Sequence, residues 1–348
     1  MWVSPAMDIS NNDLWHPKSL HKEITDAVGH PHPFSFMGGS DKILIKDCTG
    51  ANWRHTGKWQ ADAMNYMIET HDVDVIFSHY HAVDLQGHMI VKYLKEKGLP
   101  GQKLTEEEYL ELFDYVYMMA DEYIGEFLHL LDKGWTILLV SDHGQVCPEY
   151  EHLMLGDPNG VNVRIMEELG FTTLLYDEDG NELHEVDWTK TKAVATRANQ
   201  IYINLVGRNN GQGIVPEEDK YELEEEIITA LYGYKDKHTG KRVIGCALRN
   251  KDAVLLGMGG PECGDILYWT AEGYNRDHGD SLATTWGYAE TSVSPLFIAA
   301  GAGIKAGYKT DRMIKQIDVA PTVAALCGVR MPDQCEGAPV YQIFTERY

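Results

Sequence analysis

The chain of 348 residues is long enough for one large hydrophobic core, or for a core with an inserted subdomain. It has 53 acidic and 30 basic side chains, and a formal net charge of -23 disfavours binding to nucleic-acid polymers and anionic membrane surfaces. Metal ions together with a small phosphate ester suit this charge balance better.

The cysteines and the apolar runs constrain the compartment. Six cysteines occur without any paired short spacing, which argues against a disulfide framework and a thiolate zinc cluster. No apolar run approaches the ~20 residues that span a bilayer, and residues 1–16 do not form a signal peptide. The sequence therefore predicts a cytoplasmic protein with reduced thiols and no membrane partner.

The first third of the chain contains one apolar run and two helical patterns. Residues 59–68 have helical spacing, and residues 73–77 form a short apolar run that predicts a buried strand. Thr105 and Glu108 have the spacing of a capping box at the start of a long periodic stretch, and Gly134 is a good helix stop.

Two further apolar runs, 135–140 and 296–300, also predict buried strands, and a C-terminal helix is expected between Asp318 and Gly328. Strands that alternate with helices indicate a mostly parallel sheet covered on both faces. Functional residues are then expected beyond the carboxyl ends of the strands.

The middle of the chain, 149–274, has a different pattern. It contains short alternating segments such as 200–206, an acidic helical stretch near 217–231, and many turn residues. We interpret it as an inserted α+β subdomain.

The first chemical motif follows the run at 73–77. Asp84 and His88 are four residues apart, so both can point the same way and offer a carboxylate oxygen and an imidazole nitrogen to one divalent ion. The alternative is a chance pair, because the chain has 15 histidines and many aspartates. His81 is a further residue that could line the pocket.

The second motif is a stronger signal, because an apolar strand ends in adjacent Asp142 and His143. At the sharp turn that Gly144 allows, both side chains can reach one metal ion or two neighbouring ones. The alternative, a polar turn after a strand, would not need a histidine.

The third motif contains Asp277, His278 and Asp280, and it precedes the run at 296–300. By itself His278 fits a surface turn. Either aspartate could be a ligand with His278 as its outer partner.

The order of the three motifs resembles the alkaline phosphatase superfamily, in particular its type I phosphodiesterase and nucleotide pyrophosphatase branch and the bacterial predicted phosphohydrolase or phosphomutase proteins within it. The resemblance extends from about Asp74 onward and includes residues 201–205, 213–215 and 317–322. It implies a single α/β domain over 1–348, with an alkaline-phosphatase-like, mostly parallel sheet flanked by helices and the insert at 149–274.

The resemblance also implies a two-metal site. Asp84, His88 and His278 would hold one ion, and Asp142 and His143 the other, with zinc as the best fit and manganese as the alternative. The implied reaction is in-line phosphoryl transfer that hydrolyses a phosphate mono- or diester of a nucleotide or another small phosphorylated metabolite.

The nucleophile of that superfamily is not found in this chain. Members place a metal-binding Asp and a Thr or Ser nucleophile on an upstream segment. Asp47 and Thr49 imitate this pattern, but only 37 residues separate Asp47 from Asp84. We therefore interpret both as structural, the chain as N-terminally incomplete, and the catalytic nucleophile as unknown.

Two other functions remain open at this point. One is a metal-binding protein without catalytic activity, which the missing nucleophile favours, and the other is a phosphomutase of the same superfamily. A sulfatase is disfavoured, because none of the six cysteines lies in a Cys-x-Pro-x-Arg context.

Overall fold

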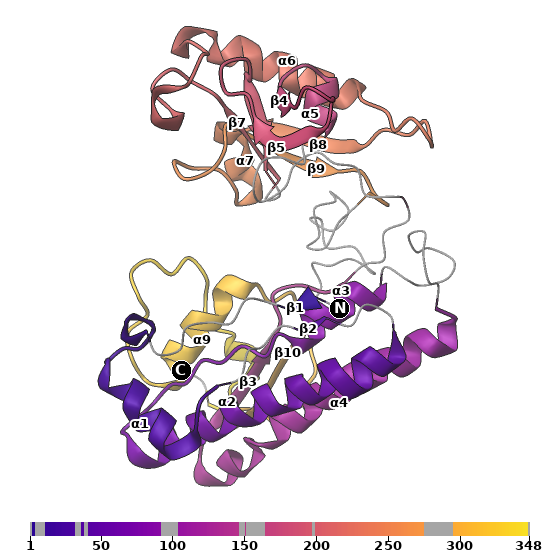
Figure 1. Ribbon diagram of the computed structural model, residues 1–348. Helices are drawn as coiled ribbons and strands as arrows, with labels where there is room; N and C mark the ends of the chain where they lie inside the picture. Colours follow the sequence, from indigo (N-terminus) through magenta and orange to yellow (C-terminus); the bar gives the residue numbers. More distant parts are fainter. Residues whose placement is uncertain are drawn as a thin grey trace. The chain divides into compact units, whose positions relative to one another are not determined.

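The computed structural model of the chain (Figure 1) describes residues 2–3, 11–31, 36–37, 41–91, 104–145, 150, 164–196, 199–274 and 295–346. It divides into two compact units. The first comprises Met1–Gln145 and Pro295–Tyr348, and the second comprises Val146–Ser294, which contains the segment 149–274 expected to be an insert. Helices and small sheets occur in both units, so the fold class is mixed α/β.

Helices dominate the first unit up to residue 133. They are η1 (Asn12–Leu14), α1 (Ser19–Val28), the π-helix η2 (Leu44–Thr49), α2 (Gly50–Thr70), α3 (Ala82–Val91), α4 (Glu106–Gly125) and the 3-10 helix η3 (Leu128–Lys133). The α4 helix contacts both α2 and α3. Buried apolar residues between them form a core that includes Trp53, Ile90, Leu112 and Val116.

Local signals correctly predicted two boundaries of these helices. The Thr105 side chain accepts the backbone N–H of Glu108, and the Glu108 carboxylate accepts the N–H of Thr105, so the capping box at the start of α4 is confirmed. Gly134 ends η3 with a left-handed φ of 85°, a conformation that costs little only for glycine.

The sheet of the first unit has two strands, β3 (Thr136–Val140) and β10 (Phe297–Gly301). They pair antiparallel, with Phe297 opposite Val140. Phe297 and Ala299 pack against a core of Ile304, Val340, Ile343 and Phe344. The remaining elements are β1 (Trp2–Val3), which pairs with β2 (Phe36–Met37), and η7 (Gln316–Asp318), α9 (Val319–Leu326) and η8 (Tyr341–Ile343).

Two expectations for this unit differ from the structure. Residues 73–77 form no strand, and Val75 and Phe77 are 52% and 87% exposed. The sheet expected to be mostly parallel is also not seen among the described residues, where every ladder between named strands is antiparallel. Apolar character indicates a tendency to pair and to be buried, but the partner and its direction depend on distant parts of the chain.

The second unit is built around a four-stranded antiparallel sheet in the order β6-β7-β9-β8. Its strands and helices are α5 (Arg164–Glu168), β4 (Leu174–Tyr176), β5 (Glu182–Val186), β6 (Ala193–Ala195), β7 (Gln200–Ile203), η4 (Asn209–Gly211), η5 (Glu217–Asp219), α6 (Lys220–Gly233), β8 (Ile244–Arg249), α7 (Asn250–Ala253), η6 (Val254–Leu256) and β9 (Ile266–Thr270). The acidic helix expected near 217–231 is therefore present as η5 and α6.

Candidate metal centre

The α3 helix presents Asp84 and His88 on one face, because residues four apart are neighbours on a helix surface. His88 Nε2 lies 2.9 Å from Asp84 Oδ1, and His88 is only 8% exposed. Asp84 lies in the first turn of α3, where the helix dipole favours a carboxylate. The spacing noticed in the sequence thus produces a joined pair of potential ligands.

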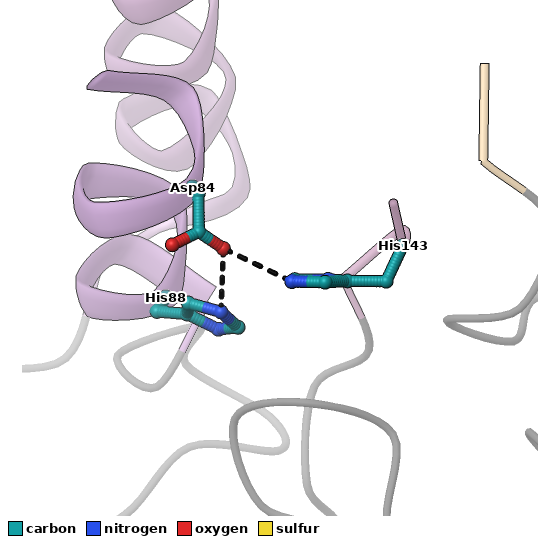
Figure 2. A group of neighbouring side chains, drawn as sticks. All are labelled: Asp84, His88 and His143. Atoms are coloured by element: carbon teal, nitrogen blue, oxygen red, sulfur yellow. Dashed lines mark ion pairs between the residues drawn. The ribbon is translucent and has the colours of Figure 1, made fainter. Parts of the chain in front are cut away.

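His143 approaches the same carboxylate from the loop that follows β3 (Figure 2). Its Nε2 lies 3.3 Å from Asp84 Oδ1, while its Nδ1 is 2.7 Å from the Gly144 carbonyl oxygen. Because a carbonyl can only accept, Nδ1 is the protonated nitrogen and donates there. In the neutral imidazole this leaves Nε2 with a lone pair that faces Asp84 and His88.

Donor atoms of Asp84, His88 and His143 all lie within 4.8 Å of one another. One carboxylate and two imidazoles are a ligand set typical of catalytic zinc sites with three protein ligands. The His88 and His143 rings are stacked, with centroids 5.5 Å apart. The residues therefore fit a divalent ion by chemistry and by proximity.

The charges of this cluster are strongly coupled. Burial raises the pKa of the Asp84 carboxyl, but hydrogen bonds with His143, His81 and His88 outweigh it and hold this pKa well below its usual range. The hydrogen bond with Asp84 raises the pKa of His143 to about 9, against the opposing effect of burial. Without a metal ion, His143 carries a proton at neutral pH that a bound ion would displace, so metal binding should release protons.

Gln145 connects the loop after β3 to α3. Its side-chain amide donates to the Asp84 carbonyl at 2.9 Å, and its amide group lies against Gly87. A Cβ at position 87 would lie only 2.0 Å from Gln145 Oε1, so glycine allows this close approach. Sequence reasoning missed both residues. Gly87 could have been noticed, because it lies three residues after Asp84 on the same helical face, whereas no pattern indicated Gln145.

Two further residues were expected in the site, Asp142 and His278. The Asp142 side chain is 79% exposed and its Oδ2 is 3.8 Å from His143 Nε2, so it borders the cluster without joining it. His278 lies outside the described residues, as do Asp277 and Asp280. The structure thus groups His143 with Asp84 and His88, whereas the resemblance paired His143 with Asp142.

Thr49 and Asp47 both lie on η2. Thr49 is 1% exposed at the end of η2, and its hydroxyl donates to the Ile45 carbonyl at 2.9 Å. Asp47 is exposed on the same helix. A hydroxyl that is buried and already bonded within its own helix is not available as a nucleophile.

Comparisons with known proteins gave no family for this chain: it matches no protein-family model, no curated protein and no solved structure. In the part of the chain that the structure describes, no helix combines the length and the apolar character needed to cross a membrane.

Proposed function

We propose that this chain is a metal-dependent phosphohydrolase that acts on phosphate mono- or diesters, with a nucleotide or another small phosphorylated metabolite as substrate. The observation that carries the proposal is the convergence of Asp84, His88 and His143, whose donor atoms lie within 4.8 Å of one another. These residues come from two motifs that are more than fifty positions apart, and both motifs contribute to the resemblance to alkaline-phosphatase-like enzymes.

The proposal assigns the first metal ion to Asp84, His88 and His143. Three protein ligands leave a coordination position for a substrate oxygen, and nitrogen and oxygen ligands without thiolates favour zinc, with manganese as the alternative. A bound ion would act as a Lewis acid on the phosphoryl group. Asp84 supplies the negative charge that offsets the ion, and Gly144 fixes the His143 tautomer.

The finer parts of the proposal rest on the resemblance. The resemblance assigns a second ion to Asp142 and His143, so His143 would lie beside both ions. The exposure of Asp142 beside His143 is compatible with this, because an exposed carboxylate can turn toward an ion. An alkaline-phosphatase-like arrangement and a small phosphate ester as the partner belong to the same proposal.

A metal-binding protein without turnover is the second candidate. One observation favours it, because the Thr49 hydroxyl is buried and bonded to Ile45. A phosphomutase of the same superfamily would share the metal site and transfer the phosphoryl group to a second hydroxyl instead of water.

Metal content and hydrolysis of p-nitrophenyl phosphate and bis-p-nitrophenyl phosphate test the proposal in the purified chain. Asp84→Ala removes a charged ligand and should weaken zinc binding by more than about 100-fold, beyond the effect usual for an outer partner. Asp47→Ala is the matched control, because Asp47 is exposed and outside the cluster. Turnover with bound metal supports the hydrolase, bound metal without turnover of either ester supports the second candidate, and a wild-type chain that binds no metal contradicts both.

A further inference from the structure

We propose that His81 is a positioning residue that holds one oxygen of Asp84 and thereby directs the other toward the metal ion, an inference that rests on the proposed metal site. His81 Nε2 lies 2.6 Å from Asp84 Oδ2. His88 and His143 lie instead beside Oδ1, at 2.9 and 3.3 Å. The two oxygens of one carboxylate are therefore divided between two sets of partners.

This division matters because the terminal torsion of an aspartate has a broad energy profile. A carboxylate without an outer hydrogen bond can rotate, and either oxygen or both can then face the ion. The bond from His81 selects one orientation before the ion arrives. Asp84 is then already ordered when the ion binds. Metal binding is stronger because it no longer includes the entropy loss of ordering this side chain.

The position of His81 in the backbone suits this role. It directly precedes α3, and its carbonyl accepts the N–H of Leu85 at 3.1 Å, which anchors it to the first turn of the helix. Asp84 follows three residues later on the same side. The anchored backbone therefore places the His81 ring within hydrogen-bond reach of the Asp84 carboxylate.

His81 differs from the three residues of the metal cluster in exposure and in its contacts. Its side chain is 40% exposed, against 10% for His88 and 15% for His143, and it is not a member of the group whose donor atoms converge. Its ring lies beside that of His79, with centroids 4.8 Å apart. His81 thus borders the site and reaches it through Asp84.

Three variants measure this role: His81→Ala, His81→Gln and the matched control His79→Ala. The His79 ring lies beside that of His81 and is exposed, but it has no ion pair with Asp84 among the described contacts. Zinc affinity is measured by calorimetric competition with a chelator, and cobalt absorption spectra report the coordination geometry. Thermal unfolding without metal verifies that each variant is folded.

We expect His81→Ala to weaken zinc binding about 10- to 100-fold, the range for outer partners of metal ligands. The amide of His81→Gln can still donate to Oδ2 and should restore part of the affinity, while His79→Ala should change it less than about threefold. The cobalt spectrum of His81→Ala should keep its coordination number, because no ligand is lost.

The outcomes separate this inference from the proposed function. If the wild-type chain binds zinc and His81→Ala binds it equally well, the positioning role is wrong and the metal site stands. If His81→Ala loses as much affinity as Asp84→Ala and the cobalt spectrum shows a lower coordination number, His81 is itself a ligand and the positioning role is again wrong. If the wild-type chain binds no zinc, the proposed metal site is wrong, and the role of His81 falls with it.

Discussion

Two aspartates, one in each unit, have opposite kinds of partners. Asp84 in the first unit is surrounded by histidines, whereas Asp265 in the second is 5% exposed and is bound by Arg208 at 2.6 and 3.2 Å. Asp265 also lies 3.2 Å from Lys220 and accepts the backbone N–H of Ile203 at 2.8 Å. Both carboxylates have a lowered pKa, although burial opposes the shift in each.

The difference shows that a buried, strongly ionised carboxylate does not by itself indicate a functional site. Arginine stays protonated at any ordinary pH, so Arg208, the partner that binds both oxygens of Asp265, cannot become a metal ligand. Histidine can lose its proton and then offer a lone pair. The identity of the partners therefore makes Asp265 a structural anchor and Asp84 a candidate ligand.

The sheets of the two units differ in how far their strands are buried. In β9 all five residues are buried, with Ile266 and Tyr268 packed toward α6 and Leu267 and Trp269 packed on the other side. In β3 no residue is fully buried, although all but Thr136 are apolar. The apolar run is comparable, but only the second unit covers both faces of its sheet among the described residues.

The largest expected effect tests this contrast with one substitution in both sheets. Ile266→Ala, at a residue that is 0% exposed, should lower the free energy of unfolding by about 2–5 kcal/mol, through lost burial and a new cavity. Ile298→Ala in β10, at 49% exposure, should cost about 1 kcal/mol or less. Segment-resolved hydrogen exchange in urea measures each unit separately. Equal losses would contradict the contrast between the two sheets.

The next effect concerns the structural aspartate. Asp265→Asn removes the carboxylate that pairs with Arg208, while Lys220 keeps its ion pair with Glu224, so the second unit should lose about 3 kcal/mol. Zinc affinity should stay unchanged, because no residue of the metal cluster belongs to that unit. A variant with weakened zinc binding and unaltered stability would reverse the roles assigned to the two aspartates.

The difference in unfolding free energy between the wild-type chain and Asp265→Asn should depend on pH. The pKa of Asp265 is lowered in the folded state relative to about 3.9 in an unfolded chain, so its stabilising contribution is present above that value. It is lost as the pH falls toward the folded pKa. The difference in unfolding free energy between the wild-type chain and Asp265→Asn should therefore shrink between pH 5 and pH 3, as measured by urea titrations. A difference that grew on acidification would contradict the assignment.

The features that could be predicted from the sequence are those that depend on neighbouring residues. The capping box at Thr105, the stop at Gly134 and the strands near 135–140 and 296–300 all appear in the structure within a residue. The direction of pairing and the fate of 73–77 were not predictable in this way. Both depend on which segments meet in the folded chain, and hydrophobicity is uninformative about that.

In the candidate site, too, the contacts between near neighbours in the sequence were predictable and the contacts between distant segments were not. The spacing of Asp84 and His88 becomes a contact because both lie on one helix, and this needs only the helical period. The approach of His143 to Asp84 joins segments almost sixty residues apart, and the resemblance implied only that both residues belong to one two-metal site. The hydrogen bond from Gln145 to the Asp84 carbonyl had no sequence signal, since a glutamine in a loop is usually solvated.

The smallest expected effect tests where the first unit gains its stability. Thr105→Ala removes the side-chain oxygen that accepts the Glu108 N–H at the start of α4, and it should cost about 1 kcal/mol. Thr105→Ser keeps that oxygen and serves as the control, with a loss of only a few tenths. Hydrogen exchange of the first turn of α4 reports the local effect. Equal losses in Thr105→Ala and Thr105→Ser would contradict the capping role, because only the alanine variant lacks the side-chain oxygen.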